Sequence, residues 1–445
     1  MTDARTFWQT LYERFDPEEP VTEPSWRAPR EYSPAADILG RLGRSFGEKK
    51  YLFYGGVGTG KSTELLHIAE QRSVDSFVVV VDLDRHFSTV IGDPDALLSV
   101  QAWEVVLLIA LGVLRATSEK LGHKWTRDEL EPLRAAITAF TGEQGDSAKI
   151  DIMKLASSVT VFVGGAVAGP AAGAVVGKGI ELLGKAVGAS SWNLLLGRRR
   201  RVDDQDERAG ALLAAVNDLL RHVATSYYGE VTVLVDGLDR LEDLEAIEAL
   251  FVRSRLLSML DVPTVMTGPI ALFHRGIAKR IRGFVPNVIA NIPVLAEAEP
   301  SAHGKGVPVC VNAYRLRTRD LDPAGTRFTD DGLAKLAYYS GGIMREFAHL
   351  IRRVAEKCWD RSLESVDDLA INTAIRARRL LYEEGLDEKA IALLRKVARD
   401  RSLPDDDSVP HLLRNWWLMP YPNRSVWWQP HPLLMISALA ESDHS

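Results

Sequence analysis

Cysteine is scarce in this chain of 445 residues, which contains only Cys310 and Cys358. Two thiols far apart in the sequence give neither a disulfide framework nor the spacing of a zinc finger. Such scarcity is typical of proteins in a reducing compartment. The N-terminal segment MTDARTFWQTLYERF carries charges throughout and lacks the apolar centre of a signal peptide, so we expect an amphipathic helix and a cytoplasmic protein.

An excess of basic residues is also lacking. The chain has 54 lysines and arginines against 60 aspartates and glutamates, which gives a formal net charge of -6. This balance excludes a protein whose whole surface binds nucleic acid, and any such contact would need a local basic patch. A hydrophobic fraction of 46% and a charged fraction of 26% are typical of a folded protein of about two or three domains.

Apolar runs of strand length alternate with segments of helical periodicity. Unbroken runs such as FVVVV and VTVLV suit parallel strands that are buried on both faces. The alternation predicts an α/β fold with a parallel sheet. We expect an N-terminal helix and connector (1–35), a core (36–300) with an apolar insertion at about 142–205, a helical segment (301–385) and a C-terminal domain (386–445).

The segment GGVGTGKS, from Gly55 to Ser62, matches the phosphate-loop pattern G-x-x-x-x-G-K-[ST]. Its glycines allow a backbone curl whose N–H groups bind phosphate oxygens, and the helix that follows presents its positive end to the same group. The pattern assigns Lys61 to the β- and γ-phosphates of ATP and Ser62 to Mg²⁺. The predicted nucleotide-binding residues are Gly55, Gly56, Val57, Gly58, Thr59, Gly60, Lys61, Ser62 and Thr63.

A second acidic motif, VTVLVDGLDR, supplies the carboxylate that such a loop needs. Asp236 follows a valine-rich run, at the strand end where open α/β sheets bind ligands, and we expect it to bind Mg²⁺. A helix N-cap is the structural alternative. Asp239 is the nearest candidate to orient the attacking water, the alternative being an ion pair with Arg240 or Arg255.

A further strand ends in VDLDRH. Its Asp82, Asp84 and Arg85 therefore point to the carboxyl edge of the predicted sheet. Two interpretations remain open for them: they line the site, or they form a solvated strand end.

In this order, GGVGTGKST, VLVDGLDR, VPTVMTGP and SGGIMREFAHLIRR resemble the AAA+ and STAND-type P-loop ATPases, closest to their origin-recognition-like and KAP-like branches. The resemblance implies an ATPase with a helical lid (301–385) and a winged helix similar to Asp387–Leu439. It implies that Thr267 senses the γ-phosphate. It also implies that Arg345, which follows a glycine pair, reads the nucleotide state.

The motif departs from AAA+ proteins in one position: Gly237 stands where glutamate usually follows the metal-binding aspartate. This departure favours slow hydrolysis and a switch rather than a motor. By analogy, a neighbouring subunit would supply an arginine finger. Each candidate also fits an ordinary basic helix face, and the candidates are Arg253, Arg255, Arg275, Arg280 and Arg282.

An uncharged run extends from Leu155 to Gly177, and glycine recurs in it at every fourth position from Gly165. On a helix these glycines would form one smooth face, although Pro170 would kink it. Three interpretations remain: a buried helical hairpin, a membrane-inserting segment followed by the basic run 198–201, and an oligomer contact or loop.

The C-terminal domain pairs a helical part with a predicted hairpin, RNWWLMPYPNRSVWWQP, that turns at Pro422-Asn423. Seven basic residues against six acidic ones from Asp387 to Pro432 supply little attraction for DNA. Paired tryptophans beside arginines suit base stacking, but in hairpins they more often pack against a core or a partner.

Together these patterns predict an ATP-binding and slowly hydrolysing switch of the AAA+/STAND type, with ATP and Mg²⁺ as ligands. The resemblance implies a homo-oligomer, an effector or sensor protein as partner, and a role in bacterial antiviral defence. Two alternatives stay open. One is a DNA-associated AAA+ regulator of transposition or replication. The other is an ATP-gated effector that associates with a membrane through residues 155–197.

Overall fold

The computed structural model describes residues 3–18, 21, 23–29, 33–44, 46–141, 151–164, 180–182, 207–422 and 426–439. By its internal contacts the chain divides into two compact units. One unit contains residues 34–54 and 64–288, and the other contains residues 1–33, 55–63 and 289–445. We call them the sheet unit and the helical unit.

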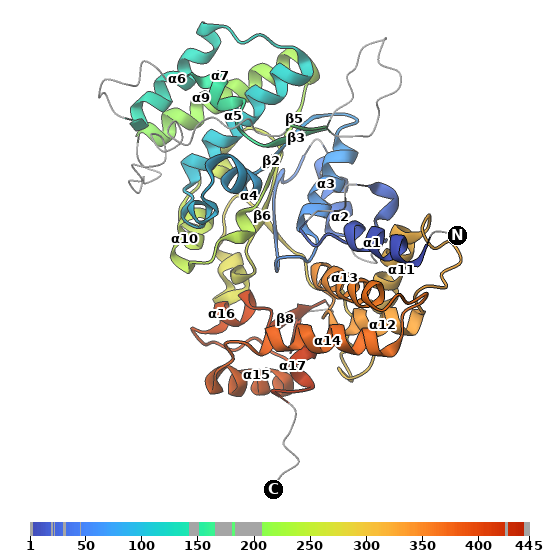
Figure 1. The fold of residues 1–445 in the computed structure, drawn as a ribbon. Coiled ribbons are helices and arrows are strands. Elements are labelled where there is room, and N and C mark those ends of the chain that lie inside the picture. Colours follow the sequence, from blue (N-terminus) through green and yellow to red (C-terminus); the bar gives the residue numbers. More distant parts are fainter. Residues whose placement is uncertain are drawn as a thin grey trace. The chain divides into compact units, whose positions relative to one another are not determined.

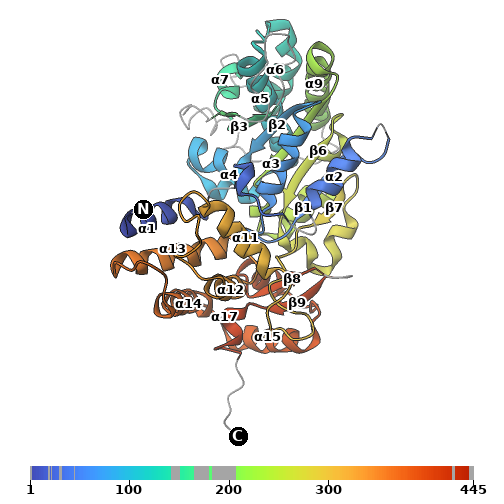
Figure 2. The same cartoon turned by 90° about the vertical axis from the view of Figure 1, so that its right-hand side faces the viewer.

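The sheet unit is built on a seven-stranded sheet of order β4-β3-β2-β5-β6-β1-β7 (Figures 1 and 2). Five neighbouring strands pair in parallel: β2, β5, β6, β1 and β7. Strands β3 and β4 extend the sheet beside β2 in antiparallel orientation. This arrangement confirms the predicted α/β fold with a parallel sheet. The strands are β1 (Lys50–Tyr54), β2 (Phe77–Asp82), β3 (Val161–Gly164), β4 (Ile180–Leu182), β5 (Val231–Asp236), β6 (Thr264–Gly268) and β7 (Val285–Val288).

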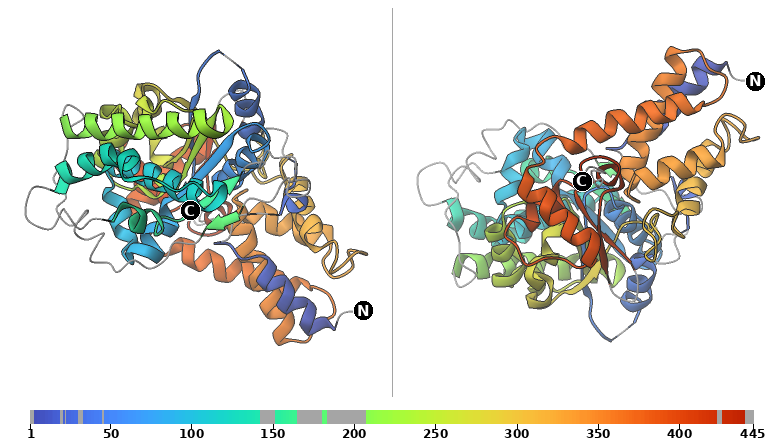
Figure 3. Two further views of the ribbon diagram at one scale, coloured as in Figure 1. Left: turned by 90° about the horizontal axis from the view of Figure 1, so that it is seen from above. Right: turned by 90° about the horizontal axis from the view of Figure 1, so that it is seen from below.

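Helices cover the sheet within this unit, and the longest of them, α5, is apolar around almost its whole circumference because it is buried along most of its length. It contacts β2 and α9, and α9 also contacts α6 (Figure 3). The helices are α2 (Pro34–Leu42), α3 (Lys61–Arg72), α4 (Leu83–Arg85), α5 (Ala102–Leu121), α6 (Arg127–Thr141), α7 (Ile152–Ala156), α9 (Glu207–Val223) and α10 (Leu244–Glu248). The shorter turns are η2 (His86–Ile91), η3 (Pro94–Ser99), η5 (Ala224–Tyr228), η6 (Leu238–Arg240), η7 (Ala249–Arg253), η8 (Leu257–Met259) and η9 (Ile270–Arg280).

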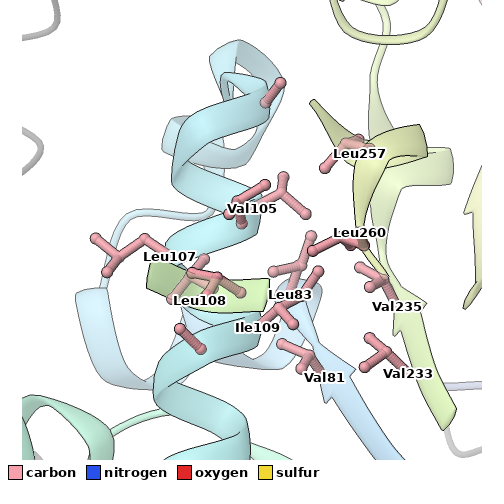
Figure 4. Packing of buried hydrophobic residues seen from close by; sticks show 14 of the residues in the cluster. Val81, Leu83, Val105, Leu107, Leu108, Ile109, Val233, Val235, Leu257 and Leu260 are labelled. Carbon is pink, nitrogen blue, oxygen red and sulfur yellow. The ribbon is translucent and has the colours of Figure 1, made fainter. Parts of the chain in front are cut away.

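The core of the sheet unit lies between the strands β2 and β5 and the helix α5. Val81, Val235 and Ile109 are all fully buried there, and Figure 4 shows them facing one another. Burying one such side chain stabilises the fold by about 1.5–3 kcal/mol relative to leaving it exposed. This packing fixes the strand ends that carry Asp82 and Asp236.

The uncharged insertion begins differently from the helix that two of our interpretations assumed. Its residues Val161–Gly164 form β3, which pairs antiparallel with β2, so a helix running unbroken from Leu155 to Gly177 is wrong. The run pairs because β2 would otherwise present an open edge of unpaired backbone groups. The glycine repeat from Gly165 and the basic run 198–201 lie outside the described residues. Among the residues described, no helix is long and apolar enough to span a bilayer.

The helical unit contains the N-terminal helix, the phosphate loop and the chain after residue 288. The amphipathic α1 packs on α13 (Figure 2). Its Phe7, Trp8 and Leu11 are fully buried, and the Trp8 Nε1 donates to the Leu363 carbonyl at 2.7 Å. The elements are α1 (Ala4–Arg14), η1 (Pro24–Trp26), α11 (Val307–Thr318), α12 (Asp330–Tyr339), α13 (Met344–Asp360), α14 (Asp368–Glu383), α15 (Glu388–Asp400), α16 (Val409–Arg414), β8 (Leu418–Tyr421), β9 (Trp427–Pro430) and α17 (Pro432–Met435).

The two strands near the C-terminus, β8 and β9, pair antiparallel, as the hairpin pattern predicts. They follow two helices, α15 and α16, and precede the short α17. Their register places Tyr421 opposite Trp427, and the two rings stack with centroids 5.0 Å apart.

Candidate nucleotide-binding site

The phosphate loop follows Tyr54, the last residue of β1, and leads into α3. Gly58 and Gly60 have φ angles of 80° and 100°, which side-chain-bearing residues rarely adopt, so the curl depends on glycine here. Lys61 is only 3% exposed, and its ammonium donates to the carbonyls of Gly55 at 3.0 Å and Gly56 at 2.5 Å. A buried ammonium held inside a ring of backbone groups is the donor that a phosphate group requires.

Arg345 of α13 lies against this loop, within the helical unit. A Cβ atom on Gly58 would be 2.5 Å from the Arg345 Cβ, and the Arg345 N–H donates to the Gly58 carbonyl at 3.4 Å. The guanidinium bonds the connector after α1: its Nε donates to the Pro17 carbonyl at 3.0 Å, and it pairs with Glu18 at 3.4 Å. The arginine that the resemblance assigns as a nucleotide sensor therefore contacts the loop through its backbone and its side-chain stem.

Trp416 is a second residue against the loop, and no motif in the sequence assigns it to the site. A Cβ atom on Gly56 would lie 2.2 Å from two carbon atoms of the Trp416 indole, so the ring rests directly on this glycine. The Trp416 backbone has a φ of 61°, an uncommon value for a residue with a side chain. Local patterns carry no signal for this contact, because the two residues are far apart in the sequence.

In the sheet unit, three polar residues gather at the edge where β1 ends. Asp82 and Asp236, the last residues of β2 and β5, are partners in the register of these strands. Thr267 of β6 is the register partner of Phe53 in β1. Strand β6 lies between β1, which precedes the phosphate loop, and β5, which ends at Asp236. Thr267, to which the resemblance assigns γ-phosphate sensing, therefore belongs to the strand between these two.

The acids at this edge have unequal surroundings. Burial raises the pKa of Asp82, and the nearby Asp84 and Asp239 raise it further, against a hydrogen bond from the Arg85 N–H at 2.9 Å that lowers it. Asp236 accepts a bond from the Gly237 N–H at 2.9 Å. A carboxylate whose pKa is raised by burial and by neighbouring carboxylates belongs to a group that a divalent cation would stabilise.

Gly237 is fixed by its neighbours as well as by its backbone. Its φ angle is 98°, and a Cβ atom there would be 2.6 Å from the Asp84 nitrogen. Therefore the glutamate that usually occupies this position in AAA+ proteins does not fit without moving the backbone. Arg240, one of the two arginines considered as ion-pair partners of Asp239, pairs with Asp84 at 2.9 Å.

The Thr267 hydroxyl is buried and has no hydrogen-bond partner among the residues that the structure describes. A buried hydroxyl without a partner costs about 1–3 kcal/mol in a folded protein. A phosphate oxygen would satisfy this hydroxyl, so Thr267 fits the nucleotide-sensing role that the resemblance implies.

Two of the five arginines considered as fingers are engaged in ion pairs within the sheet unit. Arg253 pairs with Glu245 at 2.7 Å, and Arg280 pairs with Glu248. These pairs suit the alternative that both belong to ordinary charged surfaces. Arg275 stands in a turn of positive φ inside η9.

The tryptophans of the C-terminal hairpin are mostly covered. Trp417, Trp427 and Trp428 are each 5% exposed or less, and the guanidinium of Arg401 lies 5.6 Å from the centre of the Trp427 ring. With Trp416 on Gly56, these rings contribute to packing, and bases could not stack on the three buried ones without unfolding the hairpin. The contacts favour the structural interpretation of these residues over DNA binding. Arg424 lies outside the described residues.

Comparisons with known proteins give only distant likeness. No protein-family model matches the chain. No curated protein matches it. Similar solved structures include a Walker-type ATPase of Pyrococcus abyssi (12% identity, covering 96% of this chain and 99% of that chain, TM-score 0.42). They also include the ORC2 protein of Aeropyrum pernix (11%, 98% and 97%, TM-score 0.39) and Cdc6p of Pyrobaculum aerophilum (10%, 96% and 96%, TM-score 0.37). Similarity at this level is too low to assign the chain to a family.

Proposed function

We propose that this chain is an ATP-binding protein that hydrolyses ATP slowly and acts as a nucleotide-dependent switch. The observation that carries the proposal is the phosphate loop in its structural setting. It follows a buried parallel strand, precedes a helix, and holds the buried ammonium of Lys61 among its own carbonyls. A loop of this sequence and setting binds phosphate groups.

Each polar group has a separate part in the proposal. Lys61 binds the β- and γ-phosphates, and Ser62 and Asp236 hold Mg²⁺. When bound, Mg²⁺ neutralises charge on the phosphate oxygens. Thr267 and Arg345 report whether the γ-phosphate is present. For Thr267 the support is its buried hydroxyl without a partner among the described residues, and for Arg345 it is the contact with Gly58.

Slow hydrolysis follows from the position after Asp236. Because Gly237 cannot be exchanged for glutamate without a clash, the water must be oriented by another group. Asp239 is our candidate, and Asp82 is a second one, since a raised pKa suits a carboxylate that takes up a proton. Neither has the direct position of the usual glutamate, which favours long-lived bound ATP.

The proposal is tested by Lys61→Ala. Charge-assisted hydrogen bonds contribute about 1.5–3 kcal/mol each, so the affinity for Mg²⁺-ATP should fall by roughly 10-fold or more. Equilibrium titration with a fluorescent ATP analogue measures this. The matched control is Lys396→Ala, which removes an exposed lysine of α15 and should leave the affinity unchanged. Equal affinity in Lys61→Ala and the control would refute the proposal.

Nucleotide-dependent assembly is the second part of the switch. Particle size, measured by light scattering after chromatography with ADP and with a non-hydrolysable ATP analogue, should increase only with the analogue. The same experiment on Lys61→Ala should show one size under both conditions. If the particle size of the unsubstituted chain is the same with ADP and with the analogue, the chain does not assemble in response to ATP and the switch is refuted.

A further inference from the structure

We propose that His123, Glu129 and His222 form a zinc-binding site in the sheet unit, independent of the nucleotide site. His123 lies just after the end of α5, Glu129 in the first turn of α6, and His222 in the last turn of α9 (Figure 1). Their ligand atoms all lie within 4.8 Å of one another. The cluster thus joins the junction between α5 and α6, which supplies His123 and Glu129, to α9, which supplies His222 from far along the sequence.

The spacing of the ligand atoms is that of a zinc site. The Glu129 Oε1 lies 3.5 Å from the His123 Nε2 and 3.3 Å from the His222 Nε2. Ligands bound to tetrahedral Zn²⁺ by bonds of about 2.0–2.2 Å stand roughly 3.3–3.5 Å apart. Hydrogen bonds between nitrogen and oxygen are shorter, usually about 2.7–3.2 Å. These two separations therefore match ligands of a shared ion better than hydrogen bonds, and the ligand atoms of the two histidines lie within 4.8 Å of each other.

The opposite atom of two of these ligands is already held by a neighbour. The His123 Nδ1 lies 2.6 Å from the Tyr227 hydroxyl, which leaves Nε2 for a metal. The Glu129 Oε2 accepts bonds from the Thr126 N–H and hydroxyl, both at 2.7 Å, which leaves Oε1. Such second contacts orient the ligands of protein-bound metals.

The two histidine nitrogens that face Glu129 lack other partners. Both Nε2 atoms are buried from solvent and form no hydrogen bond among the residues described. Two imidazoles and one carboxylate suit Zn²⁺ better than Mg²⁺ or Ca²⁺, which prefer oxygen ligands alone.

The bound metal would cross-link α6 and α9. Residues 142–206, which include the apolar insertion, connect α6 to α9, and Glu129 and His222 belong to these two flanking helices. Because Glu129 lies in the first turn of α6 and His222 in the last turn of α9, a bound ion would hold together the two helix ends that this connection does not join. Because binding to the folded state alone stabilises it, the sheet unit should be more stable with Zn²⁺ than without.

The test uses the full chain after removal of metal with a chelator. Co²⁺ should bind one ion per chain and give the visible absorption of a tetrahedral site, and Zn²⁺ should displace it. Zn²⁺ should also raise the midpoint of thermal unfolding. His222→Ala should lose the absorption and the stabilisation, whereas the control His411→Ala, an exposed histidine of α16, should keep both.

A milder variant covers the case in which His222→Ala does not fold. Tyr227→Phe removes only the hydroxyl beside the His123 Nδ1, and loss of such a second contact weakens metal binding by about 10–100-fold. The proposal is overturned if the stripped chain gives no cobalt absorption and binds no zinc. It is equally overturned if both variants bind as tightly as the unsubstituted chain.

Discussion

At the scale of single residues, two threonines of the central strands have opposite surroundings. Thr232 of β5 is fully buried, and its hydroxyl lies 2.7 Å from that of Ser76. Thr267 of β6 is equally buried, but its hydroxyl has no partner among the described residues. The Thr232 hydroxyl stabilises the folded state through its hydrogen bond, whereas the unpaired Thr267 hydroxyl destabilises it. Such a cost is expected of a side chain that binds a ligand.

Thr267→Val should therefore leave the free energy of unfolding unchanged or slightly increased, since valine keeps the shape and removes an unsatisfied hydroxyl. It should also reduce the preference for ATP over ADP. The matched variant Thr232→Val should lower the free energy of unfolding by about 0.5–1.5 kcal/mol, because it removes the hydrogen bond to Ser76 and leaves that hydroxyl only its longer contact with the Glu230 carbonyl at 3.4 Å. Urea denaturation and nucleotide titration measure the two effects. A large loss of stability in Thr267→Val would contradict the assignment.

Gly237 gives the second prediction at this scale. Gly237→Ala should destabilise the chain by about 1–3 kcal/mol, because a φ of 98° and the Asp84 nitrogen at 2.6 Å both oppose a Cβ atom. Gly210→Ala is the control: this glycine lies in α9 with open space around it, and alanine there should stabilise by about 0.5–1 kcal/mol. Thermal unfolding compares the two, and equal effects would exclude the constraint at Gly237.

At the scale of elements, the segment that joins α16 to β8 links the C-terminal hairpin to the phosphate loop. Trp416 occupies this segment, with a positive φ and its indole on Gly56. Backbone strain of this kind persists only where surrounding contacts enforce it. In the proposed switch, the hairpin would thus detect changes in the loop directly.

Nucleotide binding should change the fluorescence of Trp416, because phosphate contacts at the loop alter the surroundings of Gly56. Trp416→Phe should remove most of the nucleotide-dependent change. Trp359→Phe, which replaces a tryptophan of α13 that is 44% exposed, should keep it. If Trp416→Phe retains the full change at the same affinity, the indole does not detect the loop.

At the scale of the whole molecule, buried neutral histidines set the response to acid. Burial lowers the pKa of His86 to about 4 and that of His431 to about 3. In the unfolded chain a histidine titrates near pH 6.5. Between about pH 6.5 and these lowered values the unfolded state binds more protons than the folded state, so stability falls as the pH falls.

Urea midpoints should accordingly decrease from pH 7 to pH 5, with a slope of up to about 1.4 kcal/mol per pH unit for each histidine. His431→Asn should reduce this slope, because the asparagine oxygen can still accept the bond that the Leu433 N–H donates to the His431 Nδ1 at 3.2 Å. An unchanged slope in His431→Asn would show that other groups cause the acid response.

The sequence by itself determined the parallel sheet, the phosphate loop and the strand ends that carry Asp82 and Asp236, because each depends on a contiguous pattern of apolar runs, glycines and acids. It also indicated the hairpin of β8 and β9 and the amphipathic α1. Sequence-local periodicity is sufficient to predict these features, because each strand, loop and helix leaves its own pattern in contiguous residues.

Only the tertiary structure decided which distant residues meet. It turned Val161–Gly164 of the uncharged run into the antiparallel strand β3, placed Trp416 on Gly56, and brought His222 to His123 and Glu129. It also showed that Gly237 is required by the nearby Asp84 backbone. These outcomes depend on strand pairing and side-chain packing between segments far apart in the chain, where no local pattern records the partner.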